Sequence, residues 1–266
     1  MKLNQSVQKA IGILRAAASQ ADGETASGRA RGAGLPWATA VRLIKTLEAE
    51  GFLYRLPQTD RYVLGLDFDR LARSGNHGRV VAAMALPALE RLAQDVGETV
   101  FLTLVHPDGR LEVVEQVDIQ RFVRTTDYAG SPYPLHASSV GKLLLATYDE
   151  PRFEELLAER LPRYAEATIT DASDLRAEIA RVRASGWSAA VDELEEGLAA
   201  VSAGVRDAGG ELVAIVTVSG PSFRFDEAAR ARALEPLRQV AEAVERLVAG
   251  ETTRGAAAPQ PSGLRK

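Results

Sequence analysis

The sequence predicts a two-domain α+β protein. A small N-terminal unit of helices and a hairpin is joined by a helical linker to a larger domain with an antiparallel sheet packed by helices. The chain has 266 residues, which is too long for one ordinary domain and comfortable for two. Apolar residues recur with a helical period near both ends of the chain, and β-rich runs joined by turn tetrads lie between them. Hairpins accompanied by helices indicate the α+β class.

The composition is that of a soluble globular protein, with 46% hydrophobic and 26% charged residues. There is no cysteine, which excludes disulfides and thiolate metal sites and fits a reducing compartment. No apolar run approaches the roughly 18 residues of a membrane span, and the first residues contain no apolar signal core. We therefore expect a cytoplasmic protein with no membrane partner.

Charge is distributed unevenly along the chain. Residues 1–65 hold nine Lys or Arg and five Asp or Glu, so they carry +4, and the remaining 201 residues carry −8. A basic N-terminal part on an acidic body suggests that only the N-terminal part meets a polyanion. Ordinary variation of charge along a chain explains the same numbers equally well.

The first expected element is an amphipathic helix, which Asn4 or Ser6 can cap with a side-chain oxygen. Its apolar stripe consists of Val7, Ile11, Leu14 and Ala18. Glycines weaken any helix within 20–34. A further helix is expected over 36–50, because proline suits the first helical turn.

This second helix has two distinct faces. The inner positions are Val41, Ile44 and Leu47, and the opposite positions are Thr39, Arg42 and Lys45. Two short β-rich runs follow, separated by the turn-rich tetrad 57–60. They predict a hairpin, or wing.

Helix, glycine-containing turn, helix and wing within 65 residues indicate a winged helix-turn-helix. The turn sets two helices at a steep angle, so that the second can enter the major groove of DNA. The residues expected to contact DNA are Ser6, Pro36, Trp37, Thr39, Arg42, Lys45, Arg55 and Arg61. The alternative is a small helical subdomain with a solvated charged face, and the wing together with the basic balance favours DNA.

The second half of the chain predicts two hairpins and several helices. The expected hairpins are 98–106 with 111–118 and 199–206 with 211–219, and the expected helices are 139–148, 150–160, 171–185 and 227–248. The expected boundaries are 1–65 for the N-terminal domain, 66–96 for the linker, 97–249 for the C-terminal domain and 250–266 for a tail. The tail is rich in Gly, Ala, Pro and Ser, so we expect it to be disordered.

Several separate motifs, spread over about residues 4–248, resemble those of the IclR family of bacterial regulators. They include N-Q-S-V-Q-K-A-I-G-I-L at 4–14, G-L-P-W-A-T-A-V-R-L-I-K at 34–45, L-H-A-S-S-V-G-K at 135–142, D-E-L-E-E-G-L at 192–198 and V-T-V-S-G-P at 216–221. The stretch 192–198 is most similar to the branch that regulates aromatic-acid catabolism. The resemblance implies a homodimer or homotetramer, a palindromic double-stranded DNA operator, and a GAF-like C-terminal domain that binds a small effector, commonly an organic acid.

The resemblance places the effector pocket between the sheet, the loop before the helix that starts near 139, and the strand after Gly197. The residues expected to line it are Phe122, Tyr133, Ser138, Ser139, Val140, Gly141, Ala200, Thr217 and Ser219. Thr217 and Ser219 alternate along one strand, so their hydroxyls face the same side. Free N–H groups at the start of the helix, at Ser139, Val140 and Gly141, favour an anion.

Three alanines distinguish this pocket from the family pattern. Ala190, Ala199 and Ala200 stand where relatives often carry polar residues, so we expect a less polar pocket than usual. Phe122 and Tyr133 would add an apolar wall. These features favour an aromatic or branched carboxylic acid as the effector.

Other chemistries find less support in the sequence. A phosphate-binding loop would need glycine at His136 and Ser or Thr at Leu143. His136 and Ser138 lie only two residues apart without a nucleophile elbow or third orienting group, so the rival hypothesis of a hydrolase lacks a nucleophile–base pair. We expect no catalytic residue, no metal site and no cofactor. The acidic residues 192–196 predict a solvated loop, and a protein-binding role of the N-terminal domain is the remaining alternative.

The linker is also amphipathic. Its apolar residues are Val80, Val81, Met84, Leu89 and Leu92. We expect them to contact a second subunit, with packing inside one subunit as the alternative.

Overall fold

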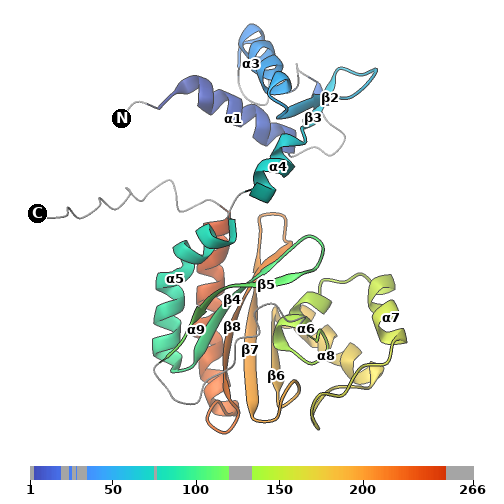
Figure 1. The fold of residues 1–266 in the computed structure, drawn as a ribbon, viewed down its shortest axis with the longest axis vertical. Helices are drawn as coiled ribbons and strands as arrows, with labels where there is room; N and C mark the ends of the chain where they lie inside the picture. Colours follow the sequence, from blue (N-terminus) through green and yellow to red (C-terminus); the bar gives the residue numbers. More distant parts are fainter. Residues whose placement is uncertain are drawn as a thin grey trace, which may run out of the picture. The chain divides into compact units, whose positions relative to one another are not determined.

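The chain divides into an N-terminal unit, Met1–His77, and a C-terminal unit, Gly78–Lys266. The computed structural model describes residues 3–18, 24–25, 28, 35–74, 77–119 and 134–249. The expected disordered tail 250–266 lies outside the described residues, as do Phe122 and Tyr133. Each unit has its own sheet (Figure 1). Each unit also has its own buried core.

The N-terminal unit contains helices and a small antiparallel sheet. Its elements are α1 (Gln5–Ala18), β1 (Glu24–Thr25), α3 (Trp37–Ala49), β2 (Leu53–Arg55), β3 (Arg61–Leu64) and α4 (Asp67–Ser74). The strand order is β1-β3-β2. The hairpin β2–β3 is the expected wing. The two-residue strand β1 was not expected, and it pairs with β3 at the register Glu24 to Tyr62.

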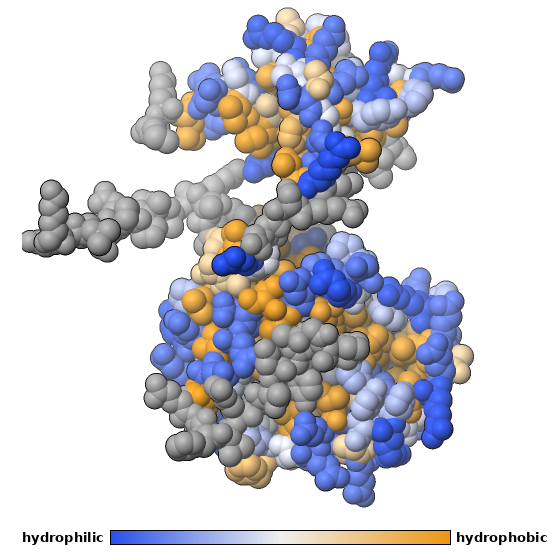
Figure 2. Space-filling model, in the orientation of Figure 1, coloured by the Kyte–Doolittle hydropathy of each residue, from blue (hydrophilic) through white to orange (hydrophobic). Residues whose placement is uncertain are grey.

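The face that α1 buries differs from the expected one. Ile13 and Ala17 are buried and form a core with Ile44 of α3 and Leu53 of β2. The expected stripe was therefore wrong for Val7 and Ile11, which are 55% and 43% exposed, and for Ala18, which is also exposed. Of the expected stripe, Leu14 packs against this core. The helix has apolar residues on two adjoining faces, and packing against α3 and the sheet selects one of them. Val7 and Ile11 of the other face are exposed, as is Leu3 just before the helix. Figure 2 shows apolar surface in the region of α1.

Helix α3 ends at a glycine that the backbone requires. Gly51 has φ +77°, and its N–H donates to the carbonyl of Glu48 at 3.1 Å. A β-carbon at this position would collide with the side chain of Asp67. The left-handed turn directs the chain from α3 into the wing.

The C-terminal unit is built on a five-stranded antiparallel sheet with the order β5-β4-β8-β7-β6. Its strands are β4 (Thr99–Val105), β5 (Leu111–Val117), β6 (Trp187–Val191), β7 (Leu198–Arg206) and β8 (Leu212–Pro221). Its helices are α5 (His77–Val96), α6 (Ser139–Leu145), α7 (Glu150–Ala158), α8 (Ala172–Ser185) and α9 (Glu227–Val248). The predicted α+β class, hairpins and helices are confirmed.

Helices cover both faces of this sheet. Helices α5 and α9 lie on one face, and α6, α7 and α8 lie on the other (Figure 1). The core on the α5–α9 side includes Leu89, Leu102, Val216, Leu237 and Val244. The core on the α6 side includes Val140, Leu143, Val182, Leu212 and Ile215.

The segment expected to be a linker divides into two helices, α4 and α5. Leu89 and Leu92 of α5 are buried in the core of the C-terminal unit, so the expectation that they contact a second subunit was wrong. Val80 and Met84, on the outer side of α5, are 58% and 41% exposed. Among the described residues, no helix has the length and apolar character that a membrane span needs.

Candidate functional site

The outer face of α3 carries the side chains predicted to contact DNA. Pro36 precedes the helix with φ −58°, and Trp37 begins it with 56% of its surface exposed. Arg42 and Lys45 are exposed, and Thr39 is half-buried. Because Ala40 and Ile44 anchor the opposite face in the core, the cationic face points outward, as insertion into a major groove requires.

One arginine of the wing, Arg55, is bonded to other residues of the wing. The guanidinium of Arg55 donates to the carbonyl of Thr59 at 3.1 Å and pairs with the carboxylate of Asp60. Gln58, at the tip of the turn, has a left-handed φ of 60°. Arg55 therefore braces the turn, while Arg61 stands exposed at its base. Whether either arginine contacts DNA stays a prediction.

Ser6 lies exposed in the first turn of α1, and its backbone N–H donates to Oδ1 of Asn4 at 3.0 Å. Of the two caps that the sequence offered, Asn4 is the one that forms. The hydroxyl of Ser6 remains a predicted DNA contact.

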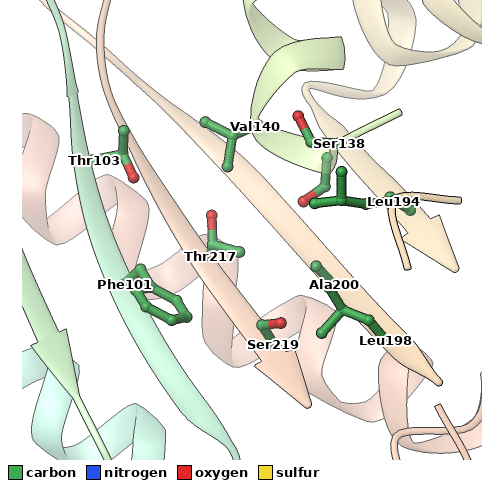
Figure 3. Close-up of a pocket in the computed structure, with 11 residues that line it drawn as sticks. Phe101, Thr103, Ser138, Val140, Leu194, Leu198, Ala200, Thr217 and Ser219 are labelled. Carbon is green, nitrogen blue, oxygen red and sulfur yellow. The ribbon is translucent and has the colours of Figure 1, made fainter. Parts of the chain in front are cut away.

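In the C-terminal unit, a cavity of about 50 Å³ lies between the sheet and α6 (Figure 3). Four strands, the start of α6 and the loop before β7 contribute to it. The lining residues are Phe101, Thr103, Ser138, Ser139, Val140, Ala190, Leu194, Leu198, Ala200, Thr217 and Ser219. None of these eleven side chains carries a charge, so the described wall of the cavity is neutral.

The register of the strands places the lining residues of the sheet next to one another. Phe101 of β4 pairs with Thr217 of β8, and Ala200 of β7 pairs with Ser219 of β8 and with Ala190 of β6. Residues paired across antiparallel strands project to the same face. Two neighbouring rows of side chains, which together come from four strands, therefore face α6.

Six of the nine residues predicted to bind an effector line this cavity, namely Ser138, Ser139, Val140, Ala200, Thr217 and Ser219. Phe122 and Tyr133 lie outside the described residues. Gly141 does not line the cavity, and its N–H, expected to be free for an anion, donates to Oγ of Ser138 at 3.1 Å. Its lack of a side chain serves packing, because a β-carbon there would lie 2.4 Å from the backbone of Leu135.

The expectation that Ala199 belongs to the pocket was also wrong. Ala199 is fully buried on the opposite face of the sheet, in the core with α9. Neighbouring residues on a strand point to opposite faces, so Ala200 and Ala199 cannot both face the cavity.

A chain of hydrogen-bonded hydroxyl groups joins two of the lining residues, Ser139 and Thr217, through Ser202. Oγ of Ser202 donates to Oγ of Ser139 at 2.8 Å and lies 2.8 Å from Oγ1 of Thr217. Because Ser202 has one hydrogen and gives it to Ser139, the hydroxyl of Thr217 is the donor to Ser202. Ser139 accepts in this chain and keeps its own hydrogen for another acceptor. Sequence reasoning missed Ser202, although it lies two residues from Ala200 and so shares its face.

A buried ion pair lies next to the cavity, in the helix that supplies Ser139 and Val140. Lys142 is 1% exposed, and its ammonium donates to Oε1 of Glu193 at 2.6 Å and to the carbonyl of Ala189 at 2.9 Å. Burial raises the pKa of Glu193, and the nearby Lys142 lowers it less. A hydrogen bond from Arg181 lowers the pKa of Glu178, whose carboxylate lies 3.6 Å from Lys142. The prediction of a solvated acidic loop was wrong for Glu193.

The loop between β6 and β7 carries both this ion pair and part of the cavity wall. It opens with Asp192, which has φ 54°, and closes with Gly197, which has φ 86°. The N–H of Gly197 donates to Oδ1 of Asp192 at 2.7 Å and ties the two ends together. Between them, Leu194 reaches the cavity and Glu193 reaches Lys142.

The pair His136 and Ser138 is used for structure. The ring nitrogen Nε2 of His136 lies 2.8 Å from the carbonyl of Pro162, and the hydroxyl of Ser138 donates to the carbonyl of Pro134. Both polar groups are therefore engaged with backbone. Within the described part of the chain, no cluster of His, Asp or Glu has a geometry that could hold a metal ion.

Comparison with known proteins assigns both units. The family model described as the IclR helix-turn-helix domain matches residues 6–57, and the model described as Bacterial transcriptional regulator IclR C-terminal matches residues 76–246. The chain is 28% identical to the HTH-type transcriptional repressor AllR of Escherichia coli (strain K12) over 224 residues, which cover 84% of this chain and 82% of that protein.

Two solved structures share the fold over most of the chain. A transcriptional regulator of the IclR family from Rhodococcus sp. is 27% identical with a TM-score of 0.70, over 93% of this chain and 97% of that one. An IclR homologue from Microbacterium hydrocarbonoxydans, complexed with 4-hydroxybenzoate, is 27% identical with a TM-score of 0.59, over 92% of this chain and all of that one. With a helix-turn-helix unit and a matching C-terminal domain, this chain belongs to the IclR family of bacterial DNA-binding transcriptional regulators.

Proposed function

We propose that this regulator binds a palindromic operator through α3 and the wing, and that a small aromatic or branched organic acid in the C-terminal cavity changes its operator affinity. The observation that carries the effector proposal is the cavity itself, in which apolar side chains surround a few hydroxyl groups. Such a wall suits a small molecule with an apolar body and one or two polar groups.

An aromatic acid fits this wall better than a sugar or a small keto acid. Phe101, Val140, Leu194 and Leu198 supply apolar surface, whereas a sugar would need many more hydrogen-bond partners. The homologue from Microbacterium hydrocarbonoxydans was crystallised with 4-hydroxybenzoate, an aromatic acid. A carboxylate in this chain would accept the unused hydrogen of Ser139, because the N–H of Gly141 is already bonded.

On the DNA side, Arg42 and Lys45 face outward from a helix whose other face is anchored in the core. Arginine reads guanine edges in the major groove, and lysine contacts phosphates. We propose that Arg42 contributes sequence preference and Lys45 contributes affinity for any duplex. Trp37 at the helix start would pack against sugar or a thymine methyl.

We further propose that the active species is a dimer or a tetramer. One N-terminal unit offers few base contacts, and two-fold proteins read palindromic sites. The exposed apolar residues Val80 and Met84 on α5 are the proposed subunit contact. The expected domain boundaries 1–65, 66–96 and 97–249, a cytoplasmic location and a non-enzymatic role complete the proposal.

One titration tests both halves of this proposal. Binding of the purified protein to a labelled duplex from the region upstream of its own gene is measured by fluorescence anisotropy, with and without benzoate and its hydroxylated derivatives. We expect salt-dependent specific binding whose midpoint moves with the acid, because a ligand shifts an equilibrium only through different affinities for the two states. Binding that no aromatic or branched acid alters would overturn the effector half and leave the DNA half standing.

A further inference from the structure

One hydroxyl in the cavity wall has no hydrogen-bond partner in the described part of the chain. Thr103 is 1% exposed, and its Oγ1 is one of two buried side-chain oxygens without a partner among the described residues. Figure 3 shows Thr103 on β4 among the residues that line the cavity, with its hydroxyl oxygen turned to the side on which Thr217 lies. A residue that lines the cavity thus carries a buried hydroxyl that no described group of the protein satisfies.

The cross-strand neighbours of Thr103 are apolar and offer its hydroxyl no hydrogen bond. On the adjacent strands it pairs with Ile215 of β8 and Val113 of β5, both apolar. Phe101, two residues earlier on the same strand, supplies a ring. The group is therefore isolated on the β4 side, away from the hydroxyl chain that joins Thr217, Ser202 and Ser139.

An isolated buried hydroxyl destabilises the protein that carries it, and valine has nearly the same shape without this penalty. Thr99, on the same strand, shows the ordinary solution, because its Oγ1 donates to Oδ1 of Asp118 at 3.2 Å. Unpaired polar groups of this kind are typical of sites where stability is sacrificed for binding.

We infer that Thr103 is a specificity-determining residue of the cavity, which selects ligands that carry a hydroxyl or a comparable hydrogen-bonding substituent on the side facing β4. This inference rests on the proposed effector function of the cavity. The preferred ligand is then a hydroxylated aromatic or branched acid, with its acid group near Ser139 of α6 and its second polar group near Thr103. A ligand without that substituent leaves Thr103 unpaired in the complex, which is how such sites reject analogues.

The test compares three variants with a matched set of probes. The probes are benzoate, its three monohydroxy isomers, phenylacetate and 4-hydroxyphenylacetate, and binding is measured by calorimetry on the full chain. The variants are Thr103→Val, Thr103→Ser, which keeps a hydroxyl, and Thr99→Val, which removes a partnered hydroxyl from the same strand.

We expect wild type to prefer at least one hydroxylated probe over its parent acid by about tenfold, the effect of one buried hydrogen bond. Thr103→Val should lose this preference while its affinity for the parent acid is retained or improved, and Thr103→Ser should keep the preference. The ligand-free Thr103→Val protein should melt about 2–4 °C higher than wild type, whereas Thr99→Val should melt lower with its preference unchanged.

Each remaining outcome has a definite meaning. If the acids bind but Thr103→Val weakens all of them equally, or changes no preference, the inference is overturned and the effector proposal stands. If Thr103→Val lowers the melting temperature as Thr99→Val does, Thr103 has a structural partner and the inference is again overturned. If no probe binds to wild type, an aromatic acid is not the effector and this inference fails with it, while operator binding is untouched.

Discussion

The ammonium of Lys142 lies 2.6 Å from Oε1 of Glu193 in the interior of the C-terminal unit, where the two side chains are 1% and 11% exposed. Lys142 comes from the helix that lines one wall of the ligand cavity, and Glu193 comes from the loop that brings Leu194 to another wall. The pair therefore fastens two parts of the cavity wall together. Its removal should affect both stability and ligand binding.

Replacement of Lys142 by methionine should lower the free energy of unfolding by about 3–5 kcal/mol, because it leaves a buried carboxylate without its partner. Urea denaturation measures this loss. The double variant Lys142→Met with Glu193→Leu should recover most of it, since the charge is then gone. Lys45→Met, an exposed lysine on α3, is the control and should change the stability by less than about 0.5 kcal/mol. An equally small loss for Lys142→Met would contradict the role of the pair.

The free energy of unfolding should depend on pH in part through the titration of Glu193. Burial raises its pKa in the folded protein above the ordinary value of 4.5, so the folded state holds this proton more tightly than the unfolded state. Its contribution to stability is therefore present at low pH and is lost as the pH rises from 4.5 through the folded pKa. Glu178, with a lowered pKa, acts in the opposite direction and loses its contribution as the pH falls through its folded pKa.

The difference between wild type and Glu193→Gln isolates this effect. Lys142, Glu178 and Arg181 surround the site and are unchanged in the variant. Relative to the variant, wild type should lose stability with rising pH above 4.5, as measured by urea denaturation at a series of pH values. A difference curve that is flat, or that rises with pH, would show that the pKa of Glu193 is not raised.

On the DNA side, Arg42→Ala should weaken specific operator binding by about 1–3 kcal/mol and relax the sequence preference. Lys45→Ala should weaken binding to all duplexes and reduce the slope of log affinity against log salt by about 1. Anisotropy titrations at several salt concentrations measure both. Arg246→Ala, an exposed arginine in the last turn of α9, serves as control. Wild-type behaviour of both α3 variants would mean that another surface reads the DNA.

The proposed subunit contact on α5 can be tested by adding charge. Val80→Glu together with Met84→Glu should shift the protein toward the monomer in sedimentation at micromolar concentration, because exposed apolar residues would be replaced by repelling charges. Tyr164→Glu, at another exposed site of the C-terminal unit, should leave the assembly unchanged. A wild-type protein that sediments as a monomer with and without DNA would refute the dimer itself.

Filling the cavity should separate ligand response from DNA binding. Ala200→Leu places a larger side chain in the wall and should abolish the rise in melting temperature that an organic acid produces. Operator affinity without the acid should stay within about twofold of wild type. Ala231→Leu, at an exposed position of α9, is the control. If Ala200→Leu keeps the full thermal response, the ligand binds elsewhere.

Local patterns predicted most of the fold and part of the site. The turn tetrads 106–109 and 207–210 located both large hairpins, and alternation along β8 placed Thr217 and Ser219 on one face. What the sequence did not predict depends on contacts between distant segments. Phe101 and Thr103 join the cavity because β4 pairs with β8, and no local signal specifies that pairing.

Two further errors have the same origin. Helix α1 offered two adjoining apolar faces, and only the docking of α3 and β2 decided between them. A lysine and a glutamate in sequence are expected at the surface, because isolated charges are rarely buried. Lys142 and Glu193 are buried because they meet across 51 positions of the chain, and this meeting is a property of the tertiary structure.

The pairing of β4 with β8 affects how the protein folds during its synthesis on the ribosome. Phe101 of β4 pairs with Thr217 of β8, which is synthesised more than a hundred residues later, so the central strands of the sheet cannot pair before then. The N-terminal unit is compact within its own 77 residues and can fold long before that. During synthesis the N-terminal, DNA-binding unit can therefore fold while the C-terminal unit is still incomplete. A truncated protein that ends before Leu212 would lack β8, and it would contain a DNA-binding unit without a folded C-terminal domain.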